Sequence, residues 1–187
     1  MKKTLRFAMA LAVPLVLLSC SPPAALAQSA MAQPAVAPSP AKTSFDEIKS
    51  LAGTWEGTLT TFPASPYQGK HLQVQLRVTS SGNAVMHEMK MPGEPDDPIT
   101  MLYLNGSSLF LSHYCDAGNR PRMIAQASAD GKTITFNLVD VSGSKRYGYM
   151  DHAVFTAIDA SHHTEDWTFL EPGNHPTRAH FDLHRVQ

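Results

Sequence analysis

Residues 72–78 read LQVQLRV, with an apolar side chain at every second position and a polar or charged side chain between. Because successive side chains of a β-strand point to opposite faces, this pattern predicts a strand with one buried face. Nine other segments have comparable strand patterns. The ten expected strands are 54–61, 72–78, 84–91, 99–104, 109–115, 123–127, 133–139, 152–158, 164–170 and 178–185.

Short turn signals join several of these segments, and their residues tolerate the positive φ angles of tight hairpins. They are Ser81-Gly82-Asn83, Asn105-Gly106 and Asp130-Gly131. Strands of similar length joined by short turns, without long helices between them, are typical of an antiparallel meander that closes on itself. The sequence therefore predicts an all-β fold, a single up-and-down antiparallel barrel of eight to ten strands.

One short helix is expected ahead of the first strand. Phe45, Ile48 and Leu51 recur at helical spacing, with Ser44 as N-cap and Glu47 three residues later, which is a capping-box pattern. We expect the barrel domain to span residues 44–187. The preceding residues 21–43 are rich in Pro, Ala, Gln and Ser, so a flexible linker is expected there.

The start of the chain has the layout of a bacterial secretory signal. Three basic residues within positions 1–6 precede an apolar run at 7–18, which is shorter than the about 20 residues of a membrane-spanning helix. Two ends are open. Residues 17–20 read LLSC and resemble a lipobox, which implies a signal at 1–20 and lipidation of Cys20. Residues 25–27 read ALA, which suits ordinary cleavage and a signal at 1–27.

The linker suits a tether between a lipid and a folded domain, so a lipid-anchored protein is slightly favoured over a soluble one. The lipid-anchored form is expected on the periplasmic side of the bacterial envelope, and the soluble form is expected to be periplasmic or secreted. Without the three basic residues of the signal, 12 basic residues remain against 16 acidic ones, a balance that argues against nucleic-acid binding. Cys115 then has no cysteine partner within the chain, so a hydrophobic core must stabilise the domain.

Residues 51–57 read LAGTWEG, where the expected helix meets the first strand. This motif resembles the Gly-x-Trp signature that opens lipocalins and related calycin barrels. The resemblance implies that Trp55 packs across the closed end of the barrel, against a basic residue of the last strand. Arg185 shares a strand face with Phe181 and Leu183, and stacking on Trp55 explains an Arg in this apolar row.

A second calycin branch, the nitrobindin-like haem barrels, has a similar opening with one further glycine. Leu59 occupies the place of that glycine here, which weakens the case for haem.

Histidine is dense in the expected barrel, and strand alternation divides its nine copies. His87, His113 and His152 fall on apolar, inward faces, with Cys115 beside His113. Imidazole and thiolate suit zinc or copper, so these four residues are candidate metal ligands. The favoured alternative is that each His meets a polar neighbour or an interior water. Five of the other six are expected in solvent: His162, His163, His175, His180 and His184.

Glu165 shares a face with Trp167 and Phe169, so we expect a buried carboxylate paired with Arg77, Arg122 or a His. This group either orients a ligand or forms a satisfied internal pair, and the structural interpretation is favoured. Residues 113–123 read as a strand, a loop and the next strand. Arg122 either attracts an anionic group at the barrel mouth or lies in an ordinary solvated loop, which is the favoured interpretation. The candidate cavity residues are His87, His113, Arg122, His152, Glu165 and Trp167.

No nucleophile elbow, phosphate loop, zinc-protease motif or dinucleotide fingerprint occurs in the sequence, and no cofactor is assigned. The leading hypothesis is a non-enzymatic envelope protein that holds a small apolar or amphipathic molecule in a barrel cavity. Alternatives are a haem- or metal-binding barrel that uses the inward histidines, or an inhibitor or assembly partner of another envelope protein. An enzyme acting on a small lipid comes last.

Overall fold

The computed structural model describes residues 37–95 and 97–186. The expected signal segment, Cys20 and most of the expected linker lie outside these residues. The compact unit that contains the barrel begins at Ala37. Within the described part of the chain, no helix is long and apolar enough to cross a membrane.

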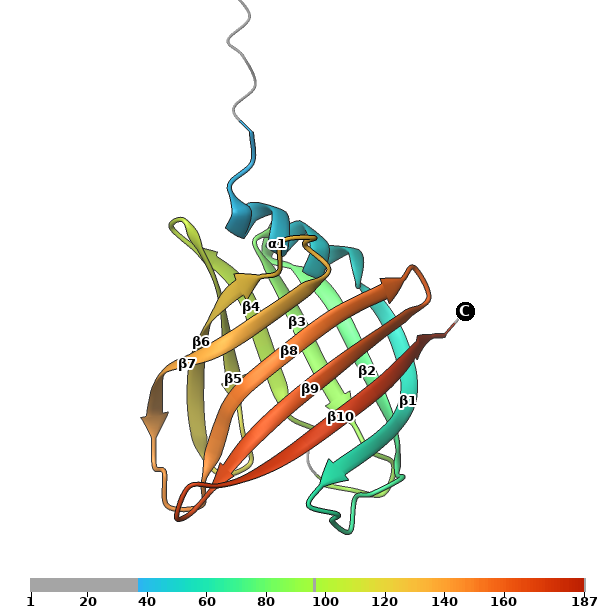
Figure 1. Ribbon diagram of the computed structural model, residues 1–187, viewed down its shortest axis with the longest axis vertical. Coiled ribbons are helices and arrows are strands. Elements are labelled where there is room, and N and C mark those ends of the chain that lie inside the picture. Colours follow the sequence, from blue (N-terminus) through green and yellow to red (C-terminus); the bar gives the residue numbers. More distant parts are fainter. Residues whose placement is uncertain (1–36, 96, 187) are drawn as a thin grey trace, which may run out of the picture. The chain divides into compact units, whose positions relative to one another are not determined.

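One helix and one 3-10 turn accompany ten strands, which close into a barrel (Figure 1). The helix is α1 (Pro40–Ser50), and the 3-10 turn is η1 (Ser80–Gly82). The strands are β1 (Gly53–Phe62), β2 (His71–Thr79), β3 (Ala84–Lys90), β4 (Ile99–Asn105), β5 (Ser108–Tyr114), β6 (Asn119–Ala127), β7 (Thr133–Gly143), β8 (Tyr149–Asp159), β9 (His162–Glu171) and β10 (His175–Arg185).

Every strand pairs antiparallel with its neighbour in sequence, and β10 pairs with β1 to close the barrel. The predicted up-and-down barrel is confirmed, with ten strands. Each of the ten expected segments falls on one of them. Closure leaves no free sheet edge, so all strands contribute their inward side chains to one core.

The helix begins at Pro40, five residues before the expected first helical residue Phe45, so the predicted capping box at Ser44 is wrong. Ser39 is the N-cap, and its hydroxyl accepts a hydrogen bond from the backbone N–H of Lys42 at 3.3 Å. Pro40 suits the first helical position because its fixed φ is already helical and it needs no N–H partner there. Ser44 is instead buried inside the helix, where its hydroxyl donates to the Pro40 carbonyl.

The helix lies across one end of the barrel (Figure 1). Its apolar residues Phe45, Ile48 and Leu51 are buried in the same core as the inward side chains of the strands. Burying three large apolar side chains contributes about 1.5–3 kcal/mol each to folding. This packing closes the barrel end near the start of β1.

Trp55 and Arg185 complete this closed end, as the resemblance implied. Trp55 is fully buried, and its indole N–H donates to the Leu51 carbonyl at 2.8 Å. The two residues are also direct cross-strand partners in the β1–β10 pair. The helix, the first strand and the last strand are therefore joined at one point.

The strand β6 starts at Asn119, four residues earlier than expected, so the predicted loop around Arg122 is wrong. Asn119 is buried, and its side-chain amide donates to the carbonyls of Ser144 and Gly148, at 2.8 and 2.7 Å. These bonds hold the start of β6 against the β7–β8 connection. Arg122 is accordingly a strand residue, and β6 pairs with β7 across it.

Candidate ligand-binding cavity

A cavity of about 440 Å³ lies inside the barrel. Its lining includes Tyr67 of the β1–β2 loop and Asp116 of the β5–β6 loop, and these loops lie at the end opposite α1 (Figure 1). The cavity volume lies within the range of about 300–1,000 Å³ that is typical of small-molecule sites. Its wall is mainly apolar. The apolar lining residues are Leu59, Pro66, Met89, Met91, Pro98, Met150, Trp167, Phe169, Ala179 and Phe181.

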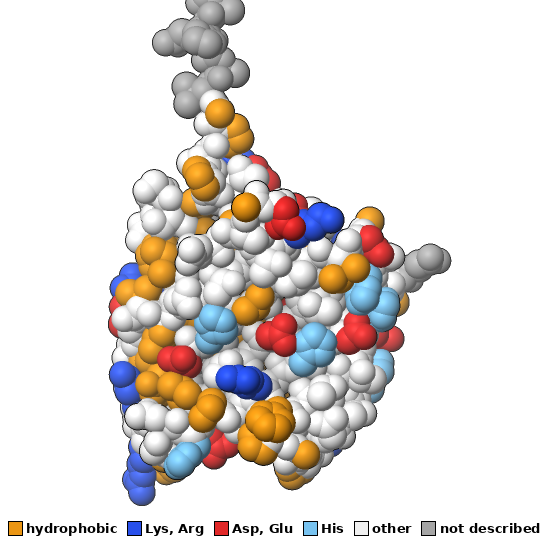
Figure 2. Space-filling model, viewed as in Figure 1, with side chains coloured by type: hydrophobic (Ala, Val, Ile, Leu, Met, Phe, Trp, Pro, Cys, Tyr) orange, Lys and Arg blue, Asp and Glu red, His pale blue; other side chains and the backbone are white. Residues whose placement is uncertain are grey.

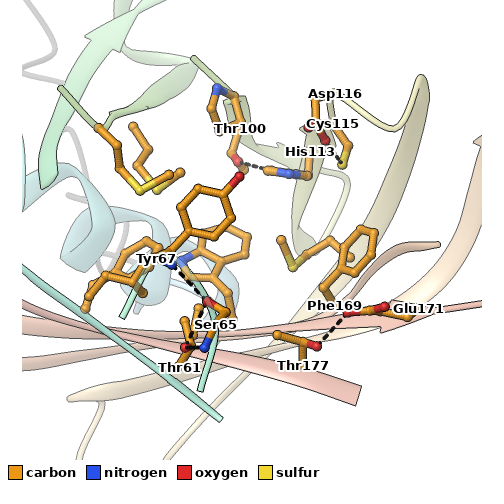
Figure 3. Close-up of a pocket in the computed structure, with 18 of the residues that line it drawn as sticks. Thr61, Ser65, Tyr67, Thr100, His113, Cys115, Asp116, Phe169, Glu171 and Thr177 are labelled. Atoms are coloured by element: carbon orange, nitrogen blue, oxygen red, sulfur yellow. Dashed lines mark hydrogen bonds between the residues drawn. The ribbon is translucent and has the colours of Figure 1, made fainter. Parts of the chain in front are cut away.

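Polar side chains make up the rest of the lining, and one group of them lies at β1 and the β1–β2 loop. Thr61, Ser65 and Tyr67 come from β1 and the β1–β2 loop, and Figure 3 shows Tyr67 projecting toward the cavity. The Thr61 hydroxyl and the Ser65 hydroxyl are 3.0 Å apart, which fixes this loop beside the opening. The three methionines of the wall are flexible and polarisable, so the lining can adapt to the shape of an apolar guest.

A buried carboxylate lies beneath the cavity. Glu165 is fully buried and accepts hydrogen bonds from three side chains. His87 Nε2 lies 3.0 and 3.2 Å from its two oxygens, His163 Nε2 lies at 3.1 Å, and Trp167 Nε1 lies at 2.9 Å. The predicted buried carboxylate with a His partner is therefore present. It does not line the cavity itself but holds His87 and Trp167, which do.

Burial by itself raises the pKa of Glu165. The charge of His87 and the hydrogen bonds from His163 and His87 outweigh it and hold the pKa well below the ordinary carboxyl value. The carboxylate is thus ionised and can only accept hydrogen bonds. Each Nε2 that contacts it must therefore carry a hydrogen, which assigns the orientation of both imidazoles.

The second ring nitrogen of His87, Nδ1, does not contact the Glu165 carboxylate. The side chain is 2 % exposed, and its Nδ1 is buried with no hydrogen-bond partner among the described residues. A buried polar nitrogen without a partner costs about 1–3 kcal/mol. His87 lines the cavity, but its Nδ1 atom is itself buried, so the folded barrel carries this cost.

His113 is a second imidazole on the cavity wall, as Figure 3 shows. Its Nδ1 and the Thr100 hydroxyl are 2.8 Å apart, and both side chains are buried. Burial, with a smaller effect from the charge of His87, lowers the pKa of His113 to about 4. The ring is therefore neutral near pH 7, and Nε2 is the nitrogen that a ligand would meet.

Trp167 connects the two histidines. Its ring centroid lies 5.8 Å from that of His87 and 5.5 Å from that of His113. The expected cavity residues His87, His113 and Trp167 thus come together from β3, β5 and β9. This arrangement can hold a largely apolar molecule and direct one polar group of it toward the His113 imidazole.

His152 does not belong to this group, so its expected inward position is wrong. The inward residues of β8 are Ala153 and Phe155, whose partners across β9 are Trp167 and Glu165. An irregularity between Met150 and His152 shifts the alternation by one residue. His152 consequently shares the outer face of the strand.

Arg122 also points away from the cavity, and its predicted role at the mouth is wrong. Its guanidinium forms an ion pair with Asp140 and lies 5.4 Å from the centre of the Phe110 ring. Met123 takes the inward position of β6 beside it.

His163 is the site residue that the sequence interpretation missed. We expected it in solvent at a turn, but it is fully buried, hydrogen-bonded to Glu165 and edge-on to Trp55 at 4.2 Å. The signal was available, because His163, Glu165 and Trp167 alternate on one face of β9. The other four histidines expected in solvent are at least partly exposed.

The expected metal ligands of the barrel interior do not form a ligand cluster in the part of the chain that the structure describes. His87, His113 and Cys115 all border the cavity, and the Cys115 thiol lies 3.4 Å from an Asp116 oxygen. The group of described residues whose ligand atoms meet closely is elsewhere, at His162, Asp182 and His184.

The sequence matches no protein-family model and no curated protein. Solved structures share the fold. Rv2717c from M. tuberculosis has a TM-score of 0.54 at 13 % identity, over 77 % of this chain and 98 % of that one. A protein of unknown function from the DUF3598 family of Nostoc punctiforme has a TM-score of 0.52 at 11 % identity, over 74 % of this chain. The match covers 49 % of the Nostoc protein, so this chain spans about half its length.

Proposed function

We propose that this lipocalin-like barrel is a non-enzymatic binding protein of the bacterial envelope, which holds a small apolar or amphipathic molecule in its cavity. The observation that carries the proposal is the apolar cavity of about 440 Å³ with two oriented imidazoles on its wall. The envelope location rests on the signal pattern of residues 1–20.

The lining favours a molecule with one polar end. Its apolar residues remove hydrocarbon from water, worth roughly 25 cal/mol for each Å² buried. The neutral ring of His113, which lies beside Trp167, favours a polar group of the ligand at that place. A polar end that meets His113 Nε2 gives this nitrogen a hydrogen-bond partner, so an amphipathic guest is a better fit than a purely apolar one.

Fluorescence titration with N-phenylnaphthylamine, a lipophilic dye, tests the cavity. We expect saturable binding with one site per chain. Met89→Trp adds a large side chain to the cavity wall and should weaken binding by at least about tenfold. Met101→Trp is the matched control because Met101 lies on the neighbouring strand, at an outward position between buried Thr100 and Leu102, and its dye affinity should not change.

Native mass spectrometry of the chain purified from its own host provides the second readout. A co-purifying small molecule that is lost in Met89→Trp supports the proposal. A ligand-free mass together with no binding across a panel of lipophilic dyes overturns it.

Haem binding is a second candidate, favoured by His113 in particular. A neutral imidazole fixed through Nδ1 by Thr100 has the chemistry and the orientation of an axial iron ligand. Leu59 opposes this function because its side chain occupies part of the wall where the haem barrels have glycine. Haemin titration followed by visible absorption separates the two candidates. A sharpened and shifted Soret band that His113→Ala abolishes supports haem binding, and a spectrum identical to that of free haemin overturns it.

A further inference from the structure

Three side chains with metal-ligand atoms meet on the outer surface of the barrel, away from the cavity. His162 lies on β9, and Asp182 and His184 lie on β10. Their ligand atoms all lie within 4.8 Å of one another. This face carries several histidine side chains beside acidic ones (Figure 2).

The strand pairing builds this group. His162 and His184 are direct cross-strand partners, and their rings stack with centroids 4.3 Å apart. Asp182 is two residues before His184, so alternation places both on the same outward face. Two paired strands of a closed barrel hold the three Cα atoms in place without help from a loop.

The spacing of the ligand atoms suits one metal ion. Asp182 Oδ1 lies 2.6 Å from His162 Nε2 and 3.7 Å from His184 Nε2. Two ligands about 2.0–2.1 Å from a tetrahedral zinc ion are roughly 3.3 Å apart. The two observed distances lie on either side of this value, so small rotations of exposed side chains reach it.

The surrounding charge also favours a cation. The outward positions of β9 from 162 to 166 and of β10 from 180 to 184 carry His, Thr and Asp, with no Lys or Arg. Glu56 of β1 is the cross-strand partner of His184 on the other side. Asp182, Asp166 and Glu56 thus give this surface a negative potential, which favours a cation.

We propose that His162, Asp182 and His184 form a surface site for a divalent transition metal such as Zn²⁺ or Cu²⁺. Two imidazole nitrogens and one carboxylate oxygen supply three ligands, and water completes the coordination. The site is independent of the cavity, which it does not border.

Isothermal titration of the untagged chain with ZnCl₂, in a buffer that does not chelate metal, tests the site. We expect one Zn²⁺ per chain. His184→Gln should weaken binding by about tenfold or more, because even loss of an outer-shell partner costs about 10–100-fold in affinity. Thermal unfolding in the same buffer checks that the exposed substitution leaves the fold intact.

His180→Gln is the matched control. His180 lies on the same strand and face, and its Nδ1 is 2.7 Å from Asp166, so it is a His–Asp pair without a second imidazole. Its removal should leave Zn²⁺ affinity unchanged, and so should His113→Ala in the cavity. Equal binding by the wild type and His184→Gln overturns the proposal. So does equal loss in His180→Gln, or no binding by the wild type at 100-fold excess of Zn²⁺.

Discussion

The guanidinium of Arg185 lies 4.1 Å from the centre of the Trp55 ring and donates hydrogen bonds to three backbone carbonyls. The acceptors are Ala160 in the β8–β9 turn, Ala52 ahead of β1, and Ser50 at the end of α1. One cation therefore joins segments that are more than 130 residues apart in sequence. Apolar neighbours cover the aliphatic part of the Arg185 side chain, while its guanidinium stays at the end of the barrel.

Arg185→Met should lower the free energy of unfolding by about 2–4 kcal/mol, because it removes both the stacking on Trp55 and the three carbonyl contacts. Urea unfolding followed by tryptophan fluorescence measures the change. Arg178→Met, at an exposed position of the same strand, should cost less than about 0.5 kcal/mol. Equal costs for the two variants would contradict the role of Arg185.

Glu165→Gln should destabilise the barrel by about 3–5 kcal/mol, since it leaves the Nε2–H groups of His87 and His163 without their anion in a buried place. The same unfolding assay applies. Asp166→Asn breaks an exposed His–Asp pair on the same strand and should cost at most about 1 kcal/mol. A Glu165→Gln variant as stable as Asp166→Asn would show that the carboxylate is dispensable.

Acid should destabilise the protein through His113 in a defined pH window. Its pKa is about 4 in the folded state against 6.5 in the unfolded state, so between these values the unfolded chain binds the extra proton. Stability is therefore lost as the pH falls through this window, by up to about 3 kcal/mol. His113→Gln removes the titrating group and should give a flatter dependence of unfolding free energy on pH. An unchanged slope would refute this assignment.

Glu165 contributes a separate loss at lower pH. Its folded pKa lies below the ordinary value of 4.5, so its stabilisation is present above that pH and is lost on further acidification. The His113→Gln variant should retain this acid transition, which Glu165→Gln should lack.

Gly57→Ala should weaken the seam between the first and last strands. A Cβ built on Gly57 lies 1.8 Å from the backbone carbonyl oxygen of Asp182, which cannot move without separating β1 from β10. We expect a loss of about 1–3 kcal/mol or more, as for other overpacked sites. Amide hydrogen exchange should show faster opening of β1 and β10. Thr58→Ala, at the exposed next position, is the control and should leave exchange unchanged.

The barrel was predictable because its signals are local. Alternation in LQVQLRV and the turn residues at Asn105-Gly106 require no knowledge of distant contacts. Glu165 and Trp167 were also placed inward correctly, since their strand is regular. His152 was misplaced because its row with Val154 and Ile158 is apolar, as is the opposite row with Ala153 and Phe155. Alternation alone did not decide which of the two faces is buried.

The sequence by itself determined the closed end of the barrel and the burial of a carboxylate. Trp55, Arg185 and Glu165 each lie on a strand with alternating apolar and polar residues. This alternation is local, so neighbouring residues are enough to predict which side chains are buried. Only the tertiary structure decided which histidines meet Glu165 and which meet Asp182. Those contacts depend on the register between β3, β9 and β10 around a closed barrel, which is set by packing of the whole core and not by any one segment.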